Sequence, residues 1–416
     1  MSSLTDTPSL ARRLGLGDAV FIGLGSMIGA GVFSAWGPAA RAAGSGLLVG
    51  LAVAAVVAYC NATSSAPLAA AYPRAGGTYL YGREVLGDWW GYLAGWGFVV
   101  GKTASCAAMA LTFAAYAAPD GWLRPVAVAV VVLVTLVNCA GITRTALLTR
   151  VSESLVLVSL VVASVACFSG RSSSPAGWAS PDHGLYGVLQ AAGLLFFAFA
   201  GYARIATLGE EVRDPARVIP RAIVTALAGA VVVYAVVAVA VLSVLGPAGT
   251  AASAAPVADA VRVVAAPWAV GVVQAGAALA SAGALLALVA GLGRTGLAMA
   301  RERDLPAWMD AVHPRSRVPH RVELGVGAVV VALVLTTDLR GAIGFSSFGV
   351  LLYYGVANAA AYAQRGEARR FPRPLQLLGC GGCLVLVATL PWTSVVLGLA
   401  VLAIGVGLRA GRLALR

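Results

Sequence analysis

Charged residues are scarce in this sequence. Of its 416 residues, 11% are charged and 60% are hydrophobic, whereas a soluble protein carries about 25% charged residues. A soluble fold of this size could not cover its surface with so few charges. The apolar residues also form long runs, such as the uncharged stretch from Ala222 to Leu245, which is long enough to cross a hydrocarbon core about 30 Å thick. The sequence therefore predicts an all-α polytopic membrane protein.

The residue types that build catalytic and metal sites are also rare within the apolar runs. His183, His313 and His320 all fall in predicted loops. Cys380 and Cys383 form a CxxC pair without further cysteine or histidine ligands nearby, and zinc requires four ligands. The runs contain no paired acids and no nucleophile with a base. We therefore expect no enzymatic activity, no metal and no cofactor.

About twelve membrane spans are predicted from the apolar runs and the glycine, proline and arginine residues that interrupt them. They cover residues 18–40, 46–70, 89–117, 124–140, 145–168, 186–209, 219–245, 268–293, 321–337, 341–364, 375–390 and 393–408. Spans one to five (18–168) and six to ten (186–364) form two halves, followed by a final pair (375–408). Residues 1–17 and 409–416 are the predicted termini.

The basic residues are distributed unevenly over the predicted loops. Of 29 lysines and arginines, 22 lie on alternate loops that start with the N-terminus, and 5 lie on the opposite loops. The remaining two, Lys102 and Arg204, fall inside spans. The positive-inside rule then predicts that both termini are cytoplasmic. Because the net charge of +12 is spread over many short loops, we expect no nucleic-acid partner.

The first predicted span contains four glycines within residues 23–31. Each glycine weakens a helix by about 1 kcal/mol relative to alanine. A break here would free the amides of Ala30 and Gly31 and the carbonyls of Met27 and Ile28. In hydrocarbon such groups are tolerated where they line a cavity or meet a ligand, and together they suit the carboxylate and ammonium of an amino acid. Close helix packing is the alternative explanation of the glycines.

The sixth predicted span contains an aromatic run around a single glycine, Phe196–Tyr202. This run could form the wall and gate of a pocket, or it could be ordinary helix core. Interrupted helices at matching positions in two halves indicate an inverted-repeat transporter with its site near the bilayer midplane.

Four groups of residues, in order along the chain, resemble the motifs of the amino acid–polyamine–organocation (APC) superfamily. They are Ile28-Gly29-Ala30-Gly31; Tyr72-Pro73-Arg74-Ala75-Gly76-Gly77-Thr78-Tyr79 with Gly95-Trp96; Phe197-Ala198-Phe199-Ala200-Gly201 with Glu210-Glu211, Pro215 and Pro220-Arg221; and Arg294, Met299-Ala300-Arg301 and Leu305-Pro306. The resemblance covers about the first ten spans. It implies a LeuT-type fold, a five-plus-five inverted repeat in which helices one and six are broken.

The resemblance also implies secondary-active transport, coupled to protons or run as exchange more often than coupled to sodium. Carried over by position, the substrate contacts are Ile28, Gly29, Ala30, Gly31, Phe197, Ala198, Phe199, Ala200 and Gly201.

Lys102 is the only lysine in the chain, and it follows Asp88 by 14 residues. That distance is about 21 Å of helix, which places Lys102 near the midplane of the third span. An ammonium at this depth is costly unless it is paired. We therefore predict that Lys102 couples transport to protons or fills the site as a cation; the alternative is a structural amine bound by the broken ends of neighbouring helices. Some proton-coupled relatives carry a lysine in the fifth helix, where this chain is apolar near Val156.

Four further residues complete the predicted site. Ser281 in span eight faces the position of a cation site in the related fold, unless its hydroxyl bonds to its own helix. Tyr202 is a predicted gate residue. Glu153 and Arg204 are predicted to be gate or structural residues. The predicted partner of Glu153 is Arg150, and that of Arg204 is Glu153 or Glu210.

The combined prediction is a secondary transporter of neutral amino acids in a bacterial cytoplasmic membrane. The expected partners are an amino acid and the lipid bilayer, and the oligomeric state stays open. Lys102 and the lack of a midplane acid disfavour cationic cargo. The alternatives are a polyamine or organic-cation exchanger, an amino acid exporter, and a sensor that binds an amino acid without moving it.

Overall fold

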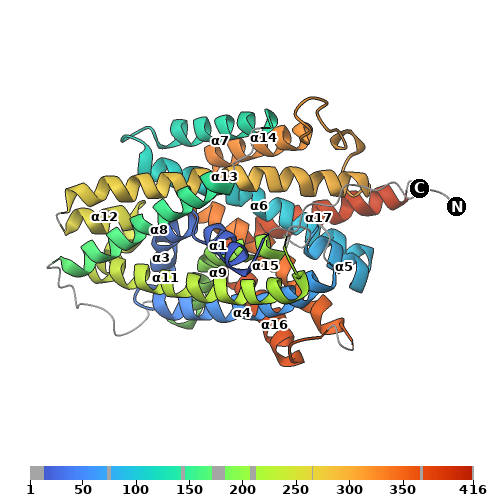
Figure 1. The fold of residues 1–416 in the computed structure, drawn as a ribbon, viewed down its shortest axis with the longest axis horizontal. Helices are drawn as coiled ribbons and strands as arrows, with labels where there is room; N and C mark the ends of the chain where they lie inside the picture. Colours follow the sequence, from blue (N-terminus) through green and yellow to red (C-terminus); the bar gives the residue numbers. More distant parts are fainter. Residues whose placement is uncertain are drawn as a thin grey trace.

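The computed structural model describes residues 14–72, 76–141, 146–170, 183–206, 212–264, 266–365 and 369–414. Nine helices in these ranges are long and apolar enough to cross a membrane, and two shorter apolar helices accompany them. No β-strand occurs in the described residues, although Leu14 and Val212 form an isolated parallel bridge. The long helices run along the length of the molecule, with α5 at one end and α12 at the other (Figure 1). We refer to these as the α5 end and the α12 end.

Every predicted span overlaps a helix or a broken helix. The helices are α1 (Leu16–Met27), α2 (Gly31–Ser34), α3 (Trp36–Ala43), α4 (Leu47–Ala71), α5 (Thr78–Leu86), α6 (Asp88–Ala117), α7 (Leu123–Cys139), α8 (Ala146–Ser169), α9 (Gly184–Phe199), η1 (Ala200–Tyr202), α10 (Ala203–Ala206), α11 (Pro215–Ala252), α12 (Pro256–Val263), α13 (Pro267–Arg301), η2 (Ala307–Met309), α14 (His320–Thr336), α15 (Leu339–Ala363), α16 (Arg373–Thr389) and α17 (Trp392–Ala414). The first predicted span corresponds to α1, α2 and α3, and the sixth to α9, η1 and α10.

Helices α6 and α15 pack closely through glycines. A methyl group added to Gly349 of α15 would lie 2.5 Å from the carbonyl oxygen of Gly97 on α6, and one added to Gly101 would lie 3.0 Å from the Cα of Gly349. One turn further along α6, the hydroxyls of Ser105 and Ser346 are 2.6 Å apart. Small residues thus bring the two backbones together, as they do in membrane helix pairs generally. This contact sets the position of Lys102.

A buried acid, Asp304, joins several helices at the α5 end. Its carboxylate is paired with Arg409 of α17 and lies 3.3 Å from the guanidinium of Arg83 on α5. The hydroxyl of Tyr79 donates to the same carboxylate over 2.8 Å, and burial, then this hydrogen bond, raise the pKa of Tyr79. Arg409 is 8% exposed and stacks over the ring of Tyr92 at 4.7 Å.

This cluster explains two differences from the predicted boundaries. Helix α13 continues to Arg301, eight residues beyond the predicted end of its span, and α17 continues to Ala414, six residues beyond its predicted end. Arg409 falls in the predicted C-terminal segment 409–416, but in the structure it is buried, and Asp304 neutralises its charge. The cluster thereby fixes α17 and α5 against the end of α13.

We predict that Asp304→Ala strongly destabilises the protein. Removal of one partner from a buried ion pair leaves an uncompensated charge and costs about 3–5 kcal/mol. The measurement is the midpoint of thermal unfolding in detergent. Asp310→Ala is the matched control, because Asp310 forms an exposed pair with Arg301 at 3.2 Å, and such pairs contribute about 0–1 kcal/mol. Equal shifts in the two variants would contradict the role assigned to Asp304.

Candidate functional site

The first helix breaks where the glycines predicted. Helix α1 ends at Met27, Ile28 leaves helical geometry (φ −79°, ψ 56°), and α2 begins at Gly31. The amide of Gly29 turns back to the carbonyl of Met27 at 2.8 Å. In the described part of the chain, the amides of Ala30 and Gly31 donate no hydrogen bond, and the carbonyl of Ile28 accepts none. These groups are the backbone donors and acceptor that a zwitterion requires.

The sixth predicted span is also interrupted, although less sharply. Helix α9 ends at Phe199, residues Ala200–Tyr202 form a single 3₁₀ turn, and α10 follows as one short turn. The change from α to 3₁₀ hydrogen bonding redirects carbonyls near the end of α9 away from the regular helical pattern. The carbonyl of Ala200 is one of these.

The two interruptions contact each other directly. A methyl group added to Gly31 would lie 2.7 Å from the Cα of Ala198, and one added to Gly201 would overlap the carbonyl oxygen of Ser26. Glycine at both positions therefore permits backbone-to-backbone contact between the breaks. The nine predicted substrate contacts all lie on these two short stretches, 28–31 and 197–201. That they bind a substrate stays a prediction.

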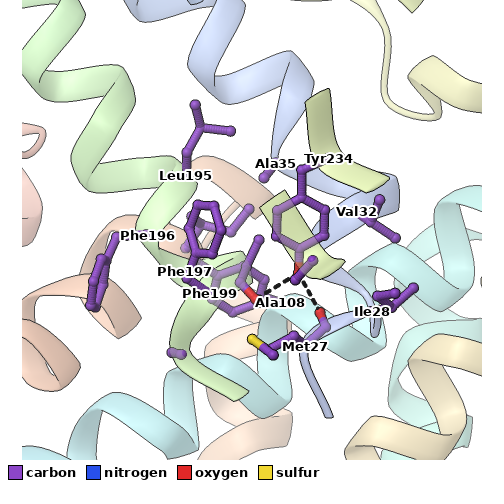
Figure 2. Close-up of a cluster of buried hydrophobic side chains, with 14 of the residues drawn as sticks. Met27, Ile28, Val32, Ala35, Ala108, Leu195, Phe196, Phe197, Phe199 and Tyr234 are labelled. Atoms are coloured by element: carbon purple, nitrogen blue, oxygen red, sulfur yellow. Dashed lines mark hydrogen bonds between the residues drawn. The ribbon is translucent and has the colours of Figure 1, made fainter. Parts of the chain in front are cut away.

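Tyr234 of α11 holds the two breaks together. Its hydroxyl lies 2.6 Å from the carbonyl oxygen of Met27 and 2.9 Å from that of Ala198. Figure 2 shows the ring reaching from α11 to the end of α1, beside the phenylalanines of α9. The carbonyl of Met27, predicted to be free for an ammonium, is occupied by Tyr234. Of the two predicted carbonyls, that of Ile28 accepts no hydrogen bond from the described residues.

Aromatic rings surround the break in α9. Phe199 meets the ring of Tyr234 edge-on with centroids 5.0 Å apart, and Phe196 meets Tyr354 in the same way at 5.8 Å. Tyr202 is fully buried and stacks on Tyr354 at 4.9 Å. The predicted gate residue therefore lies within the 3₁₀ turn of the break, packed against α15.

Lys102 reaches the second break. It is 8% exposed, and its ammonium donates to the carbonyl of Ala200 over 3.4 Å. The hydroxyl of Tyr354 donates to the same oxygen, also over 3.4 Å. No ion pair involving Lys102 is present in the described ranges. The bond to Ala200 is the contact with a broken helix end that the structural alternative expects, and the coupling role of Lys102 stays a prediction.

Glu153 of α8 lies near the first break, and Ser281 of α13 lies about one turn from Ala284, whose Cβ would be 3.2 Å from a methyl group added to Gly29. The hydroxyl of Ser281 is fully buried and has no hydrogen-bond partner among the described residues, so it does not bond to its own helix there. Glu153 lies against Gly25, where a methyl group would overlap its carboxylate. A small cavity of about 10 Å³ separates Glu153 from Ile28, room for about one water molecule.

Arg150 forms an ion pair with Asp18 of α1 at 2.6 Å, and the pairing of Glu153 with Arg150 stays a prediction. Arg204 is exposed on α10, and its predicted partner Glu210 lies outside the described residues, as do Glu211 and Pro73-Arg74-Ala75.

A multi-pass membrane protein in which two broken helices meet at buried, unsatisfied backbone groups has the build of a small-molecule transporter. Residues 14–408 match the family model described as amino acid permease. The chain belongs to this family of APC transporters.

Three relatives illustrate the range of the family. An uncharacterized transporter of Mycobacterium tuberculosis is 63% identical over 398 residues, covering 95% of this chain and 90% of the relative. The branched-chain amino acid permease BcaP of Bacillus subtilis is 26% identical, covering 95% of this chain and 92% of the permease. The cationic amino acid transporter 7, chloroplastic, of Arabidopsis thaliana is 29% identical, covering 85% of this chain and 65% of its own length. The bacterial transporters and the apolar helices indicate a bacterial inner-membrane protein.

We predict that Gly201→Ala lowers stability by about 1–3 kcal/mol and abolishes transport, because the added methyl group forces the two breaks apart. Gly355→Ala is the matched control: Gly355 is in α15, and nothing lies within 4 Å of its added methyl group. There the substitution should raise stability by up to about 1 kcal/mol. The measurements are thermal unfolding in detergent and amino acid uptake by liposomes. Normal uptake by the Gly201 variant would show that the breaks need not touch.

Proposed function

We propose that this chain is a secondary-active transporter of neutral amino acids that works by alternating access. The observation that carries the proposal is the contact between the two breaks. On one side the amides of Ala30 and Gly31 have no partner among the described residues, and on the other Lys102 binds Ala200. The proposed topology is twelve spans, ten in a LeuT-type five-plus-five repeat and two more formed by α16 and α17, with both termini in the cytoplasm.

The proposed substrate contacts follow from the backbone groups that are still available. The carboxylate would accept from the amides of Ala30 and Gly31, at the start of α2, where the helix dipole adds a favourable positive potential. The ammonium would donate to the carbonyl of Ile28. Phe197 and Phe199 of α9 would border the side chain. These contacts recognise the carboxylate and ammonium that all amino acids share, so selectivity among side chains would depend on packing against the aromatic rings.

A neutral side chain is favoured by the charges at the site. Lys102 places a cation beside the second break, and a cationic side chain would be repelled by it at short range in a medium of low dielectric constant. The branched-chain permease of Bacillus subtilis, similar over nearly its whole length, supports the same choice. A plant cationic amino acid transporter is also similar. Arginine and lysine are therefore the substrates whose transport would contradict a preference for neutral side chains.

Lys102 is the proposed coupling group. While protonated, it holds the carbonyl of Ala200 and so stabilises the turn at Ala200–Tyr202. Loss of the proton would weaken this charge-assisted hydrogen bond and release the 3₁₀ turn and the short helix α10 that follows it. A proton taken up on one side and released on the other would then bias the two conformations differently.

The test is uptake of labelled L-leucine by liposomes that contain the purified protein, with and without an inward proton gradient and with sodium replaced by choline. We expect accumulation that follows the proton gradient. In Lys102→Ala the proton-driven accumulation should fall about tenfold, because one charge-assisted hydrogen bond is lost, whereas leucine counterflow should be retained. Thr103→Ala is the neighbouring control, since the Thr103 hydroxyl bonds to its own helix at Val99.

Other outcomes separate the alternatives. Counterflow by the unaltered protein that does not depend on pH or sodium would identify an exchanger. Lys102 would then have a structural role. Leucine binding without movement would identify a sensor. If no amino acid moves or binds, the substrate class is wrong, and polyamines and other organic cations become the next panel.

A further inference from the structure

A second cavity lies at the α12 end of the molecule, away from the two breaks. Its volume is about 400 Å³, within the range of about 300–1,000 Å³ that is usual for small-molecule sites. It lies between the start of α9, the start of α15 and the turn before α17. The proposed transport site uses none of its residues. Charged, polar and aromatic side chains line it, among them Tyr186, Gln190, Asp338, Arg340 and Trp392.

Arg340 brings a fixed positive charge to this cavity. One of its terminal nitrogens donates to the side chain of Gln190 over 2.8 Å, and Gln190 in turn donates to the carbonyl of Thr389 over 3.0 Å. These bonds fix the guanidinium in place. The other terminal nitrogen, Nη1, donates no hydrogen bond within the described residues and is not among the buried unpaired atoms, so the guanidinium keeps donor capacity for a ligand.

Asp338 brings a negative charge to the same cavity. One carboxylate oxygen accepts from the amide of Gly341 over 2.7 Å and caps α15. Within the residues that the structure describes, no other hydrogen bond reaches this carboxylate, and neither Asp338 nor Arg340 forms an ion pair. Asp338 is exposed and Arg340 is partly buried. The cavity thus presents one negative and one positive group, and a ligand that carries both charges would pair with each of them.

We propose that this cavity is a binding site for a zwitterion, a molecule with an ammonium and an anionic group a few bonds apart. Arg340 would bind the anionic group and Asp338 the ammonium. Trp392 and Tyr186, 73% and 56% exposed, would cover the apolar part. Two sources share this chemistry: a free neutral amino acid, and the headgroup of a zwitterionic phospholipid.

The place of the cavity links it to the proposed transport. Gln190 precedes Phe197 by seven residues on α9, about 10 Å along the helix, so the cavity and the breaks lie at the two ends of one helix. In the proposed topology the cavity faces the outside, and an amino acid held there is a first station for uptake. This role rests on the proposed function, whereas the zwitterion site itself does not.

The experiment measures protection of a cysteine at the cavity in nanodiscs, which expose both faces and need no transport. Thr393 also lines the cavity. The Thr393→Cys variant is labelled with a charged methanethiosulfonate in nanodiscs of phosphatidylglycerol, and labelling of the six native cysteines, all free, is subtracted by use of the parent protein. The probes are L-leucine, its amide, which lacks the carboxylate, and 4-methylpentanoate, which lacks the ammonium.

We expect L-leucine alone to slow labelling. Arg340→Gln and Asp338→Asn, each added to Thr393→Cys, should raise the half-protecting leucine concentration about tenfold, as the loss of a charge-assisted hydrogen bond does. Arg41→Gln is the control: Arg41 binds the carbonyl of Ala251 at the same end but does not line the cavity, and protection should persist.

A second arm distinguishes the sources. Slower labelling in nanodiscs that contain phosphatidylethanolamine, reversed by Arg340→Gln, would support the zwitterion site with the lipid as its occupant. Equal protection by all three probes, or none from either source, would overturn the site. Protection by leucine in a protein that transports no amino acid would sink the proposed function and leave this site standing.

Discussion

Backbone groups freed inside a membrane protein must find partners within the protein, because hydrocarbon supplies none. The two breaks obey this constraint in different ways. The freed carbonyls are mostly satisfied by side chains: Tyr234 binds Met27 and Ala198, and Lys102 shares Ala200 with a tyrosine. The freed amides of Ala30 and Gly31 have no partner in the described residues. The breaks therefore lack an acceptor above all, and an amino acid carboxylate would supply it.

The rest of the fold places those side chains. Glycines in α6 and α15 bring Lys102 within reach of Ala200. Helix α11 carries Tyr234 to the end of α1 (Figure 2). Far from the breaks, the pairing of Asp304 with Arg409 fixes α17 to the end of α13. The charges at the α5 end thus fix the framework, whereas Lys102 acts on the second break.

Local sequence features predicted the helices and the first break, since glycine weakens a helix wherever it lies and apolar runs mark spans. The partners of the freed groups could not be predicted in this way. Tyr234 lies 207 residues from Met27 and appears as one aromatic residue in an apolar run. Arg409 resembles a loop arginine until Asp304, 105 residues away, is placed beside it. Such contacts depend on how distant helices pack, which the spacing of residues along one helix does not encode.

The most direct measurement of the central claim is a cryo-electron microscopy structure of the full chain in nanodiscs with bound L-leucine. The account predicts ligand density between the breaks, with the carboxylate at the amides of Ala30 and Gly31 and the ammonium at the carbonyl of Ile28. Leucine density that is absent from the breaks at saturating concentration, or that contacts neither backbone segment, would contradict it.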